Sequence, residues 1–254
     1  MGSYKPALWL LILLLAGMPG GVVSAHPPAP FIVRALEPPE AALADTRPPE
    51  SAAVTHIFGY GQLMALSCES RAAADWARHF GITIHELDFF FRLPKTANPE
   101  TGFVGSVNDG WGNLPPQGYG VHAAPVAQVL RDYGAQAVAL RNMTLDQLRA
   151  EIAADKPVIV WVTGHVEPGT GVDLLLDGQT VRVARYEHTV IVTGYDATTV
   201  TILDGKTVYQ RRLETFLAAW APLENMAIIW DAGFVPSSSP SHAESRVGEK
   251  FGGT

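Results

Sequence analysis

The chain contains a single cysteine, Cys68, at the start of the segment Ser67 to His79, whose composition is typical of a helix. A thiol in the first turn of a helix faces unpaired backbone N–H groups and the positive end of the helix dipole, and both favour the thiolate. Because the thiolate is the attacking form of cysteine, Cys68 is a candidate nucleophile, with Ser67 available as the helix cap. The competing interpretation is a buried cysteine that packs as a small hydrophobic residue.

A nucleophilic cysteine needs a base, and His188 is the best placed of the eight histidines. It opens the segment HTVIVTGY, residues 188–195, which has the β-branched composition of a strand. His122 and His165 lie near predicted loops and stay open as alternative bases. For His188 itself, the competing interpretation is a histidine whose hydrogen bonds are satisfied at a sheet edge.

Asp204 is the candidate partner of that base. The strand-like run 199–204 follows His188 after a turn centred near Asp196, and an antiparallel hairpin around this turn places Asp204 or Gly205 opposite His188. Opposed Cβ atoms lie about 5 Å apart. A carboxylate at that distance can fix the imidazole tautomer and stabilise its charged form.

Gln62 lies six residues before Cys68, in the glycine-rich stretch Gly59 to Gln62. Its amide could donate a hydrogen bond to an oxyanion that forms beside the sulfur. Glutamine in a glycine-rich turn is common, so Gln62 gains significance only in combination with Cys68, His188 and Asp204.

Helices followed by strands must position these residues. Helices are expected at residues 67–79, 124–133 and 144–154, where glycines follow the first two and the third opens with the capping-box pattern Thr-x-x-Gln. Strands are expected at residues 157–163, 188–195, 199–204 and 226–230, with a short helix at 213–220. This order, with hairpin-length connections, predicts an α+β fold with an antiparallel sheet.

Two irregular segments flank the candidate site. Residues 98–120 are rich in turn formers and predict a long loop, in which Trp111 either packs on the core or forms a wall of the cleft. Residues 164–187 precede His188 and could cover the cleft. No metal site is predicted in this second segment, because its acids match no recognised calcium loop: Glu167, Asp173 and Asp177.

Taken together, the four candidate residues resemble the papain-like cysteine peptidases. The closest likeness is to cysteine peptidase family thirty-nine, the group around the bacterial double-glycine leader peptidases, in its stand-alone exported form. It covers about residues 55–232 and rests also on further segments: Leu66 to Glu69, the loop Asn108 to Asn113, PVIVWV at 157–162 and HTVIVTGYD at 188–196.

The resemblance implies a papain-like fold, with N-terminal helices packed on an antiparallel sheet. It also implies roles for the four candidate residues, with Cys68 as nucleophile and His188 as base. Asp204 would then orient the histidine, and Gln62 would donate to the oxyanion.

The chain departs from the leader peptidases in two places. Those enzymes usually carry an acid before the cysteine and a glycine after it, where this chain has Ser67 and Glu69. Their orienting acid is usually followed by proline, where this chain has Gly205. The sequence also contains no transporter segment, so leader processing is not implied.

Composition and the N-terminal residues limit the partners and the compartment. With 18 Lys+Arg against 25 Asp+Glu and no basic block, nucleic acid is not an expected partner. Residues 1–25 have the pattern of a signal peptide, in which Lys5 precedes an apolar run and small residues precede His26; an uncleaved anchor is the alternative. We therefore expect a secreted or periplasmic protein with no stable membrane insertion after signal removal.

The predicted organisation has four parts: a signal peptide at 1–25, a Pro-rich linker at 26–50, a papain-like peptidase domain at 51–234 and a disordered tail at 235–254. The expected activity is thiol hydrolysis of peptide or amide bonds in a peptide or protein substrate, without a cofactor or metal. The alternatives are a transglutaminase-like enzyme or cell-wall amidase that uses the same groups, and a catalytically silent relative that binds peptides. The oligomeric state is left open.

Overall fold

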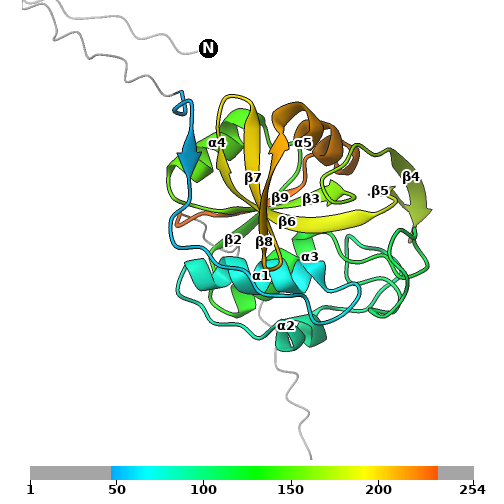
Figure 1. The fold of residues 1–254 in the computed structure, drawn as a ribbon. Coiled ribbons are helices and arrows are strands. Elements are labelled where there is room, and N and C mark those ends of the chain that lie inside the picture. Colours follow the sequence, from blue (N-terminus) through cyan, green and yellow to red (C-terminus); the bar gives the residue numbers. More distant parts are fainter. Residues whose placement is uncertain (1–46, 234–254) are drawn as a thin grey trace, which may run out of the picture. The chain divides into compact units, whose positions relative to one another are not determined.

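The computed structural model describes residues 47–233 (Figure 1). The predicted signal peptide, most of the Pro-rich linker and the predicted tail lie outside the described residues. The helices are α1 (Cys68–His79), α2 (Glu86–Arg92), α3 (Ala123–Asp132), α4 (Leu145–Ala153) and α5 (Leu213–Trp220), followed by a 3-10 turn, η1 (Ala221–Leu223). The strands are β1 (Ala52–Ala53), β2 (Ala137–Leu140), β3 (Val158–Thr163), β4 (Gly171–Leu176), β5 (Gln179–Ala184), β6 (Glu187–Tyr195), β7 (Thr199–Asp204), β8 (Thr207–Arg212) and β9 (Ala227–Trp230).

A seven-stranded antiparallel sheet organises the fold. Its strands follow the order β2-β9-β3-β6-β7-β8, and the short β1 pairs with β6. The long strand β6 therefore lies inside the sheet, between β3 and β7. Strands β4 and β5 form a separate two-stranded hairpin.

Both faces of this sheet are covered by helices (Figure 1). In β3, Ile159 and Trp161 belong to the core shared with α1, α2 and α3, whereas Val158 and Val160 belong to the core shared with α4 and α5. Alternate residues of a strand point to opposite faces, so a strand buried on both sides is apolar throughout. This explains the unbroken apolar run at residues 157–162.

The predicted fold class is confirmed, because N-terminal helices pack on an antiparallel sheet. Three of the four predicted helices and all four predicted strands occur within a residue or two of their expected bounds, and α5 matches its expected bounds fully. The capping box at the start of α4 is present, with the side chains of Thr144 and Gln147 each bonded to the other's backbone N–H. Gly81 and Gly134, which follow α1 and α3, both adopt positive φ.

The sequence does not predict α2, β1, β2, β8, η1 or the β4–β5 hairpin. This hairpin lies in residues 164–187, the segment that could cover the cleft. Asp177 and Gly178, at φ values of 49° and 76°, form the tight turn that joins β4 to β5. An Asp-Gly pair with two positive φ angles is the usual type I′ hairpin signal, so Asp177 serves the turn.

Among residues 47–233, no helix combines the length and apolar character that crossing a bilayer requires.

Candidate active site

Cys68 is the first residue of α1, and its side chain is buried. Helix α1 packs against β6, the strand that carries His188. Ser67 precedes the helix, but its hydroxyl donates to Glu86 Oε1 at 2.5 Å and makes no cap hydrogen bond. The expected Ser67 cap is therefore wrong, because the hydroxyl oxygen accepts the backbone N–H of Met64, at 3.2 Å, in place of an N–H of the first turn.

His188 and Asp204 form a hydrogen-bonded pair. His188 is the second residue of β6 and Asp204 is the last residue of β7, and Nε2 of the histidine lies 2.9 Å from Oδ1 of the aspartate. The His188 side chain is largely buried, whereas that of Asp204 is partly exposed. Because Asp204 engages Nε2, Nδ1 is left as the nitrogen that can accept a proton.

The strand register that brings the pair together differs from the predicted one. Ile191 pairs with Leu203, and this register, if continued, would place Lys206 rather than Asp204 opposite His188. The predicted direct opposition is therefore wrong, and the two side chains meet diagonally across the end of the hairpin.

The difference arises at the turn. Asp196 Oδ1 accepts the N–H groups of Thr198 and Thr199, each at 2.7 Å, so Asp196 opens the turn instead of lying at its centre. The turn is thus centred one residue later than expected, and a bulge near the end of β6 recovers part of the shift.

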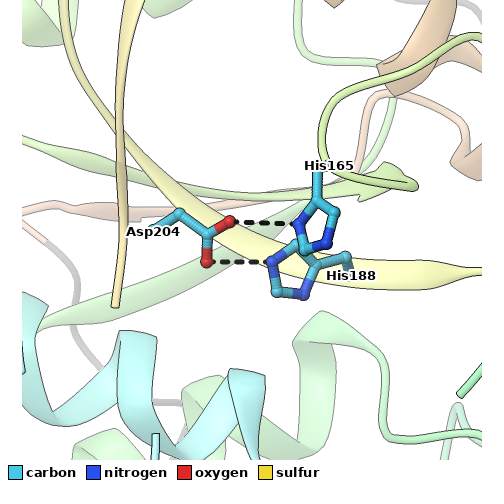
Figure 2. A group of neighbouring side chains, drawn as sticks. All are labelled: His165, His188 and Asp204. Carbon is cyan, nitrogen blue, oxygen red and sulfur yellow. Dashed lines mark hydrogen bonds and ion pairs between the residues drawn. The ribbon is translucent and has the colours of Figure 1, made fainter. Parts of the chain in front are cut away.

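Three side chains approach the carboxylate of Asp204, and Figure 2 shows two of them, His165 and His188. The Tyr209 hydroxyl donates to Asp204 Oδ2 at 3.2 Å, and His165 Nδ1 lies 3.6 Å from the same oxygen, while His188 approaches the other oxygen. Burial acts to raise the pKa of Asp204, but the hydrogen bond and charge of His188, with smaller contributions from Tyr209 and His165, hold that pKa below its ordinary value. Asp204 is therefore a carboxylate at neutral pH.

The two alternative bases occupy different places. His122 is fully buried at the start of α3, where its ring bonds Glu100 and Tyr119 and not Asp204. His165 lies in the turn after β3 beside Asp204, and its side chain is 65 % exposed. His165 is thus the alternative that shares the site with His188.

Two buried glutamates lie beside Cys68. The Cys68 thiol donates to Glu69 Oε2 at 3.4 Å, and the ligand atoms of Cys68, Glu69 and Glu187 all lie within 4.8 Å of one another. Glu69 also accepts the backbone N–H of Val121 at 2.6 Å. One oxygen of Glu187, Oε2, has no hydrogen-bond partner among the described residues.

These surroundings oppose the thiolate. Burial, followed by the charges of Glu69 and Glu187, raises the pKa of Cys68 well above its ordinary value, although a backbone hydrogen bond at Thr189 acts in the other direction. Burial likewise raises the pKa of Glu69 to about 7. Removal from water and two nearby acids therefore oppose the effect of the helix start, which favours the thiolate.

Gln62 reaches the same site from the segment before α1. Together with Cys68 and Asp204 it lines a cavity of about 10 Å³, which is room for about one water molecule. Its amide nitrogen donates to the carbonyls of Met64 at 2.5 Å and Ala65 at 2.9 Å. The structure thus brings three of the four predicted residues to one cavity, with the Gln62 donors turned toward backbone oxygens.

Trp111 lies on the His188 side of the site. Its indole N–H donates to the backbone carbonyl of Glu187 at 2.8 Å, and its ring contacts those of His165, Tyr186 and His188. The side chain of Trp111 is 40 % exposed, so it both packs and borders the site.

The sequence analysis did not predict that Glu69 and Glu187 lie beside Cys68, or that His165 approaches Asp204 together with His188. Glu69 directly follows Cys68 and Glu187 directly precedes His188, so their adjacency in the sequence was an available signal. His165 and Tyr209 carried no such signal, since they reach Asp204 only through the fold. The acids considered for calcium, Glu167, Asp173 and Asp177, do not gather into a cluster of metal-ligating groups in the described residues.

With this geometry, the fold is a papain-like α+β fold in which a histidine and an aspartate pair beside the first helix. The model of the Peptidase_C39 like family matches residues 54–228, and the chain belongs to that family.

Two relatives extend this comparison. The uncharacterized protein YvpB of Bacillus subtilis is 26 % identical over 136 residues, which are 52 % of this chain and 52 % of YvpB, so the chain spans about half the length of that curated relative. The crystal structure of a C39-like peptidase from Bacillus anthracis aligns with a TM-score of 0.65 at 24 % identity, over 72 % of this chain and 98 % of the other. This second likeness is one of fold.

Proposed function

We propose that this chain is a thiol hydrolase that cleaves peptide or amide bonds, with Cys68 as the nucleophile and His188 as the base. The observation that carries the proposal is the 2.9 Å bond between His188 Nε2 and Asp204, made next to the helix that begins at Cys68. Family membership supports a peptide or protein as the substrate.

In the proposed reaction, His188 Nδ1 takes the proton of the Cys68 thiol while the sulfur attacks the carbonyl carbon of the substrate. The protonated His188, held by Asp204, then gives this proton to the departing amine, which leaves a thioester on Cys68. Water, deprotonated by the same imidazole, hydrolyses the thioester and restores the thiol. Because its surroundings raise the pKa of Cys68, proton transfer accompanies attack and no ion pair forms beforehand.

The oxyanion of this reaction needs hydrogen-bond donors near the sulfur. In the proposal these are the Gln62 amide and a backbone N–H of the first turn of α1. Gln62 must release the carbonyl of Met64 or Ala65 to take this role. Substrate binding therefore has to turn the Gln62 side chain.

Incubation with a mixed peptide library, read by mass spectrometry, tests the hydrolase. We expect new peptide termini from the wild-type protein and none from Cys68→Ala, which keeps the small apolar character of the position. A second incubation with an added primary amine separates hydrolysis from transfer, because a transglutaminase-like enzyme would join the amine to the acyl product. Cleavage by Cys68→Ala at the wild-type rate contradicts the proposal.

A catalytically silent relative that binds peptides is the second candidate. It is favoured by the buried Cys68 thiol, whose surroundings raise its pKa. The same library separates the two candidates: a silent relative retains peptides equally in the wild type and in Cys68→Ala and releases no cleaved product from either.

We propose further that the protein is exported, on the signal-peptide pattern of residues 1–25. N-terminal sequencing of protein collected outside the cytoplasm should then begin at His26. A sequence that begins at Met1 contradicts cleavage.

A further inference from the structure

A second histidine, His165, lies beside the His188–Asp204 pair and has no role in the proposed reaction. Figure 2 shows His165 and His188 approaching different oxygens of Asp204 from the same side. The two rings lie 5.5 Å apart between centroids, and one ring nitrogen of His165, one of His188 and a carboxylate oxygen of Asp204 all lie within 4.8 Å of one another. Two imidazole nitrogens and one carboxylate oxygen are the donor set of many zinc sites.

The turn that carries His165 is fixed in place. Val166 follows it with φ of 60°, a left-handed conformation that a β-branched residue adopts only under tertiary constraint, and its side chain is fully buried. Arg211 of β8 donates to the His165 carbonyl at 3.0 and 3.2 Å, and Thr163 donates to the carbonyl of Glu167 at 2.6 Å. The position of His165 beside Asp204 is thus built into the fold, although its ring is open to solvent.

We propose that His165 Nδ1, His188 Nε2 and Asp204 form a binding site for Zn²⁺ at the edge of the candidate active site. Zinc–ligand bonds of about 2.0–2.2 Å in tetrahedral geometry separate ligand atoms by about 3.3–3.5 Å. In this structure each histidine approaches its own oxygen of Asp204, at 2.9 Å from His188 Nε2 to Oδ1 and 3.6 Å from His165 Nδ1 to Oδ2, so the carboxylate must shift between the two rings when it binds the ion.

The rest of the environment suits a zinc ion. Tyr209 holds Asp204 Oδ2 from the outside, which is the kind of outer hydrogen bond that orients a ligating carboxylate. The exposure of His165 leaves the fourth position open to water and gives the ion a path from solvent. Nitrogen and oxygen ligands without sulfur also suit Co²⁺, which can serve as a spectroscopic probe.

Zinc at this site would block the proposed reaction, an inference that rests on the proposed function. When Nε2 of His188 binds the ion, its N–H bond to Asp204 is lost and the ring proton moves to Nδ1. Nδ1 can then no longer accept the proton of Cys68. The site would therefore be inhibitory and reversible by a chelator.

Direct binding tests the site separately from the activity. Full-length protein is titrated with Zn²⁺ by calorimetry and with Co²⁺ by visible absorption, in the wild type, His165→Ala and Cys68→Ser, with His56→Ala as a matched histidine variant away from the cluster. We expect one equivalent of metal in the wild type, and Co²⁺ d–d bands without a sulfur-to-cobalt charge-transfer band. His165→Ala should raise the Zn²⁺ dissociation constant by more than about tenfold. Loss of a residue that only hydrogen-bonds to a metal ligand already costs about that much, and loss of the ligand itself should cost more. Cys68→Ser and His56→Ala should bind as the wild type does.

Equal Zn²⁺ affinity in His165→Ala, or loss of binding in Cys68→Ser, would overturn the site. Inhibition is then compared as the ratio of peptide cleavage with and without Zn²⁺ within each variant. If the wild type binds Zn²⁺ through His165 but cleaves no peptide, the proposed function fails and the site stands. If it cleaves peptide but His165→Ala is inhibited as strongly as the wild type, the site fails and the function stands.

Discussion

At the scale of single residues, Cys68 lies under opposing influences. The helix start and a backbone hydrogen bond at Thr189 favour the thiolate, whereas burial and the two glutamates favour the thiol, and the second group prevails. Glu69 accepts the hydrogen bond of the Cys68 thiol, and its carboxyl group has no N–H that could stabilise a thiolate. The resting state is therefore a protonated cysteine next to a buried acid.

Glu69→Gln tests this balance. The change removes a nearby negative charge and offers an amide N–H to the sulfur, so the pKa of Cys68 should fall, because loss of a like charge favours the thiolate. The measurement is the pH dependence of the alkylation rate of folded protein with iodoacetamide, whose midpoint should move to lower pH. Glu214→Gln, an exposed change on α5, is the matched control and should leave the midpoint in place. An unchanged midpoint in Glu69→Gln would show that the charge of Glu69 does not raise the pKa of Cys68.

At the scale of elements, the segment before Cys68 is tied to α2 by one buried side chain. Glu86, the first residue of α2, accepts from the backbone N–H of Leu63 at 2.9 Å, from the Ser67 hydroxyl at 2.5 Å and from Arg71 at 3.2 Å. These bonds bracket the segment in which Gln62 approaches Cys68. A short helix distant from the sheet thus positions the nucleophile through a carboxylate.

Glu86→Ala should lower the free energy of unfolding by about 3 kcal/mol, because three donors, two of them buried, lose their acceptor at once. Urea unfolding at neutral pH measures the change. Glu214→Ala, at an exposed position, should stay within about 0.5 kcal/mol of the wild type. A loss no larger than that of the control would mean that water replaces Glu86 and that α2 does not fix the segment.

At the scale of the whole molecule, the buried Glu69 makes stability depend on pH. Its pKa is about 7 in the folded protein against an ordinary value of 4.5, so between these values the folded state keeps a proton that the unfolded chain has released. The contribution to stability is fully present below pH 4.5 and is lost as the pH rises toward 7. Burial also lowers the pKa of His122 and raises that of Glu187, so other groups make stability depend on pH and the contribution of Glu69 is measured as a difference between two proteins.

Glu69→Gln should therefore gain stability relative to the wild type as the pH rises from 4.5 to 7, by on the order of 3 kcal/mol. Urea unfolding of both proteins at pH 4.5, 6 and 7.5 gives the difference at each pH. A difference that is independent of pH would indicate that Glu69 is already ionised in the folded protein at pH 4.5.

The sequence alone predicted the elements whose signals are local. The capping box before α4, the glycines after α1 and α3, and the β-branched runs of β3, β6 and β7 each follow from neighbouring residues, and so did the α+β class. It also paired His188 with Asp204, since both are ends of consecutive strands. Helix α2 has only seven residues, with three consecutive phenylalanines among three charged residues, and is too short for a helical period to stand out.

The tertiary structure decided what depends on contacts between distant segments. A pKa is set by desolvation and by every charge within a few ångströms, and neither quantity can be counted before the chain is folded, so the burial that holds Cys68 as a thiol was invisible in the sequence. In the same way, His165 lies beside Asp204 because β3 and β7 flank β6 in the sheet. This order of strands cannot be read from residues that are neighbours along the chain. The sequence by itself determined which residues could do chemistry, and the packing of the sheet against α1 determined the protonation state and the neighbours with which they would do it.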